Sequence, residues 1–315
     1  MIDNERICMM ALAMADGINN ARAHVLLEHF GTATEVFAAR KRPWEIARGL
    51  GSGYPTSQIV SRMEEGLRRA EQEARFIEHY HIRLYTIADP DYPYRLRENH
   101  NPPIVCYYRG CADLNCPKVI GVVGTRQATH YGLWLTEKLL RDLAEVFPEM
   151  LVISGLALGI DVCAHHAALQ LGLPTVGVFG HGLDNCYPQA HRDIARQMLD
   201  RGGLFTDYPS ETPIAGANFL KRNRLIAGLS DAVVVVESPE RGGALSTATH
   251  AFSNNRDVFA FPGRVGNDHS VGCNQLIRDN KAGLITSAHD LIRAMMWDVC
   301  TTAPHPDTQL KLPFK

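Results

Sequence analysis

The amino-acid sequence predicts an α/β fold in which a small all-α domain precedes an extended, Rossmann-like, doubly wound and mostly parallel sheet. From residue 117 onward, short β-branched runs alternate with stretches whose apolar residues recur at helical spacing. The strand-like runs carry apolar residues on both faces, which indicates that helices cover both faces of the sheet. The predicted strands are residues 119–124, 151–154, 175–179, 203–207, 232–237 and 257–261.

The first part of the chain is predicted to contain short helices. One helix is expected to end at Gly31, a typical C-cap, and Thr34 is expected to cap the next one. The turn at residues 17–19 loosely resembles a helix-hairpin-helix, whose backbone amides can hold a DNA phosphate, but Asn19 stands where a second glycine is expected. A small helical packing domain over residues 1–68 is therefore the preferred interpretation.

A charged helix is predicted from Gln58 to about Tyr80. Its apolar residues follow steps of three and four, so one stripe is buried, and its outer face mixes acidic with basic residues. This pattern predicts a connector rather than a basic groove. Residues 69–298 are assigned to the Rossmann-like domain, and residues 299–315 are expected to form a polar tail.

Two helices are predicted between the first strands of the sheet. The first carries leucines from Leu135 to Leu143 at helical spacing, and the second runs from Asp161 to Leu171 with Gly172 as its C-cap.

Composition excludes several classes of protein. The 315 residues carry 32 Lys and Arg against 34 Asp and Glu, so the formal net charge is −2 and a generally basic nucleic-acid coat is excluded. Apolar runs are too short to span a membrane, and the N-terminus lacks the pattern of a signal peptide. Eight cysteines include no CxxC pair, which favours reduced thiols in the cytoplasm over a zinc site.

Glycine-rich turns follow four of the predicted strands, at the sheet edge where ligands bind in such folds. They span residues 124–126, 154–161, 180–184 and 242–247. Such turns let backbone N–H groups approach an anion closely. Neither the GxGxxG dinucleotide fingerprint nor a P-loop is present, so the turns suit a ligand with several phosphates rather than a nucleoside triphosphate.

A cluster of three cations, Lys221, Arg222 and Arg224, follows the aromatic residue Phe219. Guanidinium groups pair with phosphates, and a phenyl ring can stack on a base. A cluster of this size is usually a solvated face, but its position beside the glycine-rich turns favours nucleic-acid binding.

No catalytic constellation stands out. Asp161 is most simply a helix N-cap, with the alternative that it orders the preceding loop. His165 is equally well explained as a core or loop-anchoring residue and as a functional one. His181, Asp184 and His191 match no strong metal-binding pattern, and neither a metal nor a cofactor is expected.

These motifs resemble those of the bacterial DNA-processing protein A (DprA/Smf) family over residues 80–295. Its GSR…YG and SGLAxGID…AH elements are similar to residues 124–132 and 154–165 here. The similarity continues through residues 182–188, 219–230 and 261–263, and the helical N-terminus loosely matches the SAM-like domain of the family.

The resemblance implies a non-enzymatic, dimeric protein that binds and shields single-stranded DNA. It also implies loading of the RecA recombinase during natural transformation. The dimer would form through the Rossmann-like domain. The nucleic-acid-binding residues expected here are Gly124, Thr125, Arg126, Gly155, Ala157, Phe219, Lys221, Arg222, Asn223, Arg224, Gly243, Ser246 and Thr247.

The sequence departs from the family pattern in three places. Thr125 replaces a serine but keeps the hydroxyl, and residues 238–243 form a longer turn than is common. The C-terminal winged-helix domain of many members is expected to be absent or truncated. Residues 309–314 faintly resemble a sliding-clamp-binding peptide.

An alternative is a nucleotide-hydrolysing enzyme of the lysine-decarboxylase-like (LOG) group, which shares a Rossmann-type sheet. That group resembles this chain in its glycine loop but carries a glutamate in PGGxGTxxE. Residues 242–250 offer His250 and no glutamate, which favours binding over hydrolysis.

Overall fold

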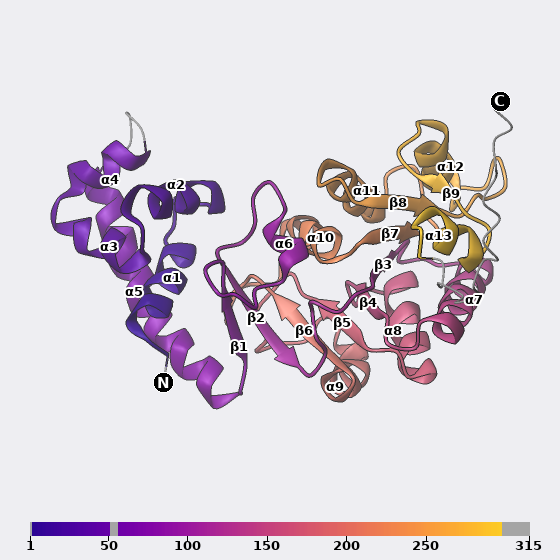
Figure 1. Ribbon diagram of the computed structural model, residues 1–315, viewed down its shortest axis with the longest axis horizontal. Coiled ribbons are helices and arrows are strands. Elements are labelled where there is room, and N and C mark those ends of the chain that lie inside the picture. The colour runs from indigo at the N-terminus through magenta and orange to yellow at the C-terminus, as the bar shows by residue number, and fades with distance from the viewer. Residues whose placement is uncertain (1, 51–55, 298–315) are drawn as a thin grey trace, which may run out of the picture.

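The structure is a computed structural model that describes residues 2–50 and 56–297 (Figure 1). The N-terminal part is helical, and the rest of the described chain builds a single large sheet covered by helices. The N-terminal helices are α1 (Asn4–Met14), α2 (Asn20–Phe30), α3 (Ala33–Ala38), the 3-10 helix η1 (Ala39–Lys41), α4 (Pro43–Leu50) and α5 (Thr56–His79). No helix among the described residues is long and apolar enough to cross a membrane.

Caps at the N-terminal helices explain part of the sequence there. Asn19 is the N-cap of α2, and its side chain accepts a 3.0 Å hydrogen bond from the Arg22 amide. Gly31 ends α2 with φ of +88°, as predicted. The prediction that Thr34 caps the next helix is wrong, because Thr32 occupies that position and accepts from the Glu35 amide. The Thr34 hydroxyl instead donates to a carboxylate oxygen of Glu5.

The predicted boundary at residue 68 falls inside α5, which continues to His79. The helices share one apolar cluster with the outer face of the first two strands, which contribute Leu84, Val105 and Tyr107. The buried carboxylate of Glu73 on α5 also accepts hydrogen bonds from the amide and hydroxyl of Ser210. The helices therefore pack directly on the sheet and its loops, and their SAM-like assignment stays a prediction.

The described residues form one nine-stranded sheet with the order β1-β2-β6-β5-β4-β3-β7-β8-β9. The pairs β1–β2 and β2–β6 are antiparallel. All other neighbouring strands of this sheet pair in parallel. The strands are β1 (Arg83–Thr86), β2 (Val105–Gly110), β3 (Val119–Val123), β4 (Leu151–Ser154), β5 (Thr175–Val178), β6 (Gly202–Thr206), β7 (Ala232–Val235), β8 (Asp257–Ala260) and β9 (Gly283–Leu284). The mostly parallel sheet confirms the predicted fold class.

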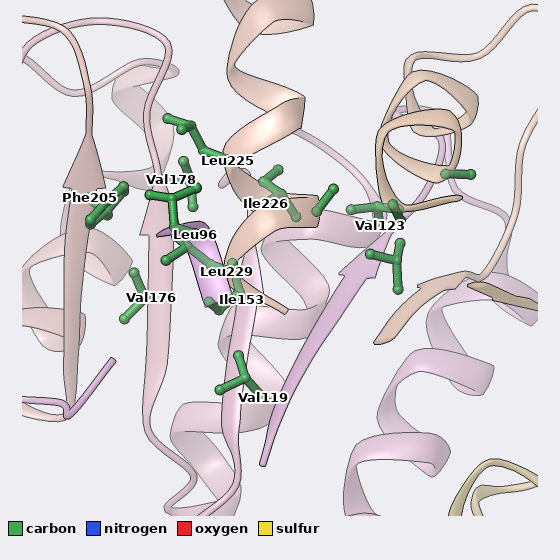
Figure 2. Packing of buried hydrophobic residues seen from close by; sticks show 14 of the residues in the cluster. Leu96, Val119, Val123, Ile153, Val176, Val178, Phe205, Leu225, Ile226 and Leu229 are labelled. Carbon is green, nitrogen blue, oxygen red and sulfur yellow. The ribbon is translucent and has the colours of Figure 1, made fainter. Parts of the chain in front are cut away.

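Helices cover both faces of the sheet. One face is covered by α6 (Tyr94–Arg97), α10 (Gly216–Leu229), α11 (Gly243–Ser253) and α12 (Val271–Arg278). The other face is covered by α7 (His130–Val146), α8 (Ile160–Leu171) and α13 (Ala288–Ala294). The 3-10 helix η2 (Gln189–His191) and α9 (Arg192–Asp200) lie beside α8 on this second face. Figure 2 shows how α10 is seated, with Leu225, Ile226 and Leu229 packed toward Ile153 and Val178 of the sheet. This contact fixes the rotation of α10 and so decides which of its polar residues face inward.

Candidate nucleic-acid interface

The order of the strands creates a switch point between β3 and β7. The chain winds from β3 through β4 and β5 to β6 in one direction, and then returns to place β7 on the other side of β3. Ligands in open α/β sheets bind at the carboxyl ends of the strands where the winding direction reverses. The loops that leave β3 and β7 meet at this edge.

A cavity of about 420 Å³ lies at the switch point, and we call it the switch-point cavity. It is bounded by the loops after β3, β4 and β7, by one side of α10 and by the start of α11. Its lining residues are Val123, Gly124, Thr125, Arg126, Gln127, Ala157, Asp161, Gly216, Phe219, Leu220, Arg222, Asn223, Ile226, Ser238, Pro239, Gly242, Gly243, Ala244 and Thr247.

Close packing of the loops shapes this cavity. The amide of Thr125 donates to the carbonyl of Glu237 at 2.8 Å, and the amide of Ile160 donates to the carbonyl of Thr125 at 3.2 Å. Gly159 has φ of +78°, and a Cβ there would lie 2.2 Å from the Thr125 carbonyl oxygen. Glycine is therefore required at residue 159 both for its backbone conformation and for the contact between the two loops.

Arg222 forms the cationic floor of the cavity. Its side chain is almost fully buried, and Nη1 donates to the carbonyl oxygens of Gly155, at 2.7 Å, and of Val178. Its Nε atom is buried without a hydrogen-bond partner among the described residues. Burial lowers the pKa of Arg222 to about 10, so the guanidinium keeps its charge at neutral pH.

Asp161 places a buried carboxylate beside this guanidinium. Burial raises the pKa of Asp161, while the charge of Arg222 and hydrogen bonds from the backbone of Ala157 and Gly155 oppose that rise. Asp161 is the second residue of α8, whose N-cap is Gly159, so the simpler prediction that Asp161 is the N-cap is wrong. Its contacts with residues 155 and 157 agree with the alternative that it orders the preceding loop.

Aromatic and cationic side chains meet at the rim. The ring of Phe219 stacks on that of Tyr187, with centroids 5.6 Å apart and planes inclined by 28°. The Arg126 guanidinium carbon lies 5.9 Å from the centre of the Phe219 ring. Arg126 is exposed and makes no ion pair with another described residue. A flat ring and a free cation therefore stand at one entrance, beside a smaller side cavity of about 40 Å³.

The structure brings most of the predicted site residues together. Those lining the switch-point cavity are Gly124, Thr125, Arg126, Ala157, Phe219, Arg222, Asn223, Gly243 and Thr247. Gly155 lines the side cavity. Lys221, Arg224 and Ser246 line neither cavity, and the Arg224 guanidinium is paired with the carboxylate of Asp207.

Helical spacing could have separated the three cations in advance. Residue 222 lies four positions before Ile226 and seven before Leu229, which places it on the buried stripe of α10. Lys221 and Arg224 lie off that stripe. The prediction grouped the three because they are close in sequence, whereas only Arg222 faces the sheet.

Other residues at the site were not among those predicted. Tyr187, Gly216, Leu220 and Gln127 line one or other cavity. The sequence signal for them is weak, because Tyr187 and Gln127 lie in loops, Gly216 begins α10, and Leu220 is an apolar residue of α10 that resembles a core residue. His165 is completely buried and its Nδ1 lies 2.7 Å from the Thr175 hydroxyl, which supports the core interpretation. Within residues 2–50 and 56–297, no three potential metal ligands gather.

The strand order and the cavity define an α/β protein of the Rossmann-like class whose cationic, glycine-walled cavity suits a phosphate-bearing ligand. Comparison with known proteins defines it further. Residues 83–296 match the DNA recombination-mediator protein A family, and the chain belongs to that family.

Individual relatives agree with this assignment. Protein Smf of Synechocystis sp. is 34% identical over 302 residues, which cover 94% of this chain and 74% of the relative. The solved structure of DNA processing protein A from Streptococcus pneumoniae is similar with a TM-score of 0.78 at 30% identity, over 93% of this chain and 98% of the other. A Helicobacter pylori DNA processing protein A, described for its single-stranded DNA binding mode, has a TM-score of 0.61 at 27% identity, over 70% and 98%.

Proposed function

We propose that the protein binds single-stranded DNA in the switch-point cavity. The observation that carries the proposal is the meeting of Arg126, Arg222 and Phe219 around a glycine-walled cavity at the carboxyl edge of the sheet. The relative from Helicobacter pylori is described as binding single-stranded DNA, which supports the same ligand here.

Phosphates would be held by two kinds of donor. Arg126 is exposed at the rim, so its side chain can move to meet a phosphate. The Arg222 guanidinium is held beneath the loops by its hydrogen bond to the Gly155 carbonyl oxygen, so its charge stays in one place. Helix α11 begins at Gly243, its N-cap Gly242 has no side chain that could cap the first amides, and residues 242–244 line the cavity. The first amides of α11 therefore lie at the cavity wall and are suited to an anion.

Bases would stack on the aromatic rim. Phe219 and Tyr187 present neighbouring rings, and stacking tolerates every base because each has a flat face. Sequence-independent capture follows from this combination of backbone charge contacts and stacking.

We also propose that the protein is not an enzyme. The Glu237 carboxylate accepts hydrogen bonds from the amide and hydroxyl of Thr129, at 2.9 and 2.5 Å, and so anchors the start of α7. The buried Asp161 holds the loop after β4. These engaged carboxylates favour binding over nucleotide hydrolysis.

Self-association is proposed at the β9 edge of the sheet. Leu284 on this edge strand is 52% exposed, and Phe252 on the neighbouring α11 is 57% exposed. A second copy could extend the sheet and cover both side chains. Replacing Leu284 with Glu is expected to convert a dimer to a monomer in analytical ultracentrifugation, whereas an unchanged sedimentation coefficient would place the dimer contact elsewhere.

We propose that the protein delivers the bound strand to the RecA recombinase. This step would take place in the cytoplasm during natural transformation. It follows from the family resemblance and from a site that would leave part of the strand accessible. The described cysteines are free thiols, as is usual in a reducing compartment.

The DNA site is tested by fluorescence anisotropy with labelled oligo-dT at several salt concentrations. Arg126→Ala is expected to weaken binding and to lower the slope of log affinity against log salt by about 0.7 for each lost phosphate contact. Arg196→Ala removes an arginine on α9 that is paired with Asp193, and it should behave like the parent protein. Equal affinity and slope for Arg126→Ala and the parent would reject this site, and release of free base from nucleoside monophosphates would favour hydrolysis instead.

A further inference from the structure

Two exposed aromatic rings lie on α7, outside the switch-point cavity. Tyr131 and Trp134 are 53% and 52% exposed, and they stack with centroids 6.1 Å apart and planes inclined by 22°. Large aromatic side chains normally bury most of their surface. A stacked pair that leaves half of each ring in solvent presents flat apolar surface to a ligand.

A second opening adjoins these rings. A cavity of about 560 Å³, which we call the α7 cavity, lies between the start of α7 and the loop after β8. Tyr131 forms part of its wall, together with Thr129, His130, Pro262, Gly263, Arg264, Asn267 and Ser270. Arg264 is exposed and makes no ion pair with another described residue. Asp268, the acidic residue of the same loop, is exposed and does not line the cavity.

The two cavities are neighbours along the same edge of the sheet. Residues 124–127 line the first and residues 129–131 line the second. Arg126 and Tyr131 are five residues apart, so their Cα atoms are at most about 18 Å apart. The loops behind them are also joined, because the Ser238 amide donates to the His269 carbonyl at 2.9 Å and the Gly272 amide donates to the Ser238 carbonyl at 2.8 Å. A strand that leaves the first cavity past Arg126 reaches the second without crossing the molecule.

We propose that Tyr131 and Trp134 form a second base-stacking subsite for the same single-stranded DNA, with Arg264 as its phosphate contact. The subsite rests on the proposed function of the switch-point cavity and extends it to a longer strand. Single-stranded DNA is favoured as the occupant because a stacked aromatic pair lies beside an arginine that has no ion pair among the residues described, and this combination binds bases and backbone together. Because the α7 cavity adjoins the switch-point cavity, one DNA strand can occupy both.

The test compares a short and a long oligo-dT, of about four and about sixteen nucleotides, which span the usual range of single-strand site sizes. Trp134→Ala and Tyr131→Ala are expected to weaken binding of the long oligonucleotide roughly five-fold or more, because one stacking contact is lost. Binding of the short oligonucleotide should stay within error of the parent. Trp44→Ala is the matched control, since Trp44 is another exposed tryptophan, located on α4, and it should leave both affinities unchanged.

A second measurement observes the stacking itself. The sequence has three tryptophans, so a Trp44→Phe, Trp297→Phe variant leaves Trp134 as the single fluorophore of this type. Its emission should be quenched by the long oligonucleotide and not by the short one.

Each outcome decides the question. An unchanged affinity of Trp134→Ala for the long oligonucleotide, or no quenching, overturns the subsite while leaving the switch-point cavity intact. Equal loss for both lengths overturns it as well, because the effect would then come from the first cavity or from folding. If the parent binds neither oligonucleotide, the proposed function itself fails. Dissociation of a dimer by Trp134→Ala without an effect on DNA would assign the rings to a protein contact instead.

Discussion

The guanidinium of Arg222 occupies the space directly in front of Gly155. Its Nη1 atom donates to the Gly155 carbonyl oxygen at 2.7 Å, and a Cβ on Gly155 would lie 2.2 Å from the same nitrogen. The glycine and the arginine therefore depend on each other, because the loop after β4 comes this close to the guanidinium only without a side chain.

Gly155→Ala is expected to displace Arg222 and to lower the free energy of unfolding by about 1–3 kcal/mol, as overpacking of a dense interior does. Binding of oligo-dT should weaken at the same time. Gly216→Ala is the matched control, since Gly216 lines the same cavity and a Cβ there would meet nothing within 4 Å. Urea unfolding and anisotropy measure the two effects, and equal behaviour of the two variants would show that the contact is unimportant.

Arg224 is expected to act on stability rather than on DNA. It is paired with Asp207, whose Oδ1 atom is buried without a hydrogen-bond partner in the described part of the chain. Arg224→Ala leaves the carboxylate without its cation and should lower the free energy of unfolding by about 1–3 kcal/mol. Adding Asp207→Asn should restore part of that loss.

In anisotropy titrations, Arg224→Ala should keep the salt slope of the parent protein, in contrast to Arg126→Ala. A slope reduced as much as that of Arg126→Ala would return Arg224 to the set of phosphate contacts.

Phe219→Leu is expected to weaken binding of single-stranded DNA by about 1–3 kcal/mol, because it keeps an apolar side chain but loses the ring that stacks on Tyr187. The salt slope should not change, since no charge is removed. Tyr80→Leu serves as the control, since Tyr80 is another exposed aromatic residue and lines neither cavity. A changed slope with an unchanged affinity at low salt would contradict a stacking role.

His165 should make stability depend on pH. Burial, reinforced by the charge of Arg222, lowers the pKa of His165 to about 3, from 6.5 for the unperturbed side chain. Below pH 6.5 the unfolded chain therefore binds a proton that the folded protein does not. Stability due to this group is complete above pH 6.5 and falls, by up to about 1.4 kcal/mol per pH unit, as the pH decreases toward 3.

The measurement is the difference in free energy of unfolding between pH 7 and pH 5. His165→Asn should reduce this difference, although it also lowers stability at both values because the buried ring is lost. His289→Asn replaces an exposed histidine on α13 and should keep the difference of the parent. A difference that is the same in all three proteins would mean that His165 titrates normally in the folded state.

The central sheet could be predicted from the sequence because its strands are buried on both faces. Strands such as β3 and β7 are uninterrupted apolar runs that are buried throughout, and helices alternate with strands in this part of the chain. Strand β9 could not be predicted, because it has only the two residues Gly283 and Leu284 and exists through its pairing with β8. Strand β2 was also missed, since the segment before it is rich in turns and it pairs with β6 far along the chain.

The sequence predicted which loops form the site, but it did not predict which side chains in those loops contact one another. Parallel winding brings the turns after β3 and β7 to one edge, so Thr125 and Gly243 were placed together correctly. The burial of Arg222 depends on how α10 is seated on the sheet, which the apolar residues of the helix determine. The exposed Tyr131–Trp134 stack was not predicted, because Tyr131 lies four residues before Leu135 and helical spacing therefore places it with the buried leucines of α7.

The pairing of β2 has a consequence for the growing chain on the ribosome. One face of β2 belongs to the cluster formed with helices α1 to α5, which are synthesised before it. Its partner on the side toward the centre of the sheet is β6, where Tyr107 meets Thr206, about a hundred residues later. Until that segment emerges, β2 carries an unpaired edge beside an apolar cluster, a combination that favours aggregation. Nascent chains that stall before β6 should therefore need a chaperone more than chains that stall after it.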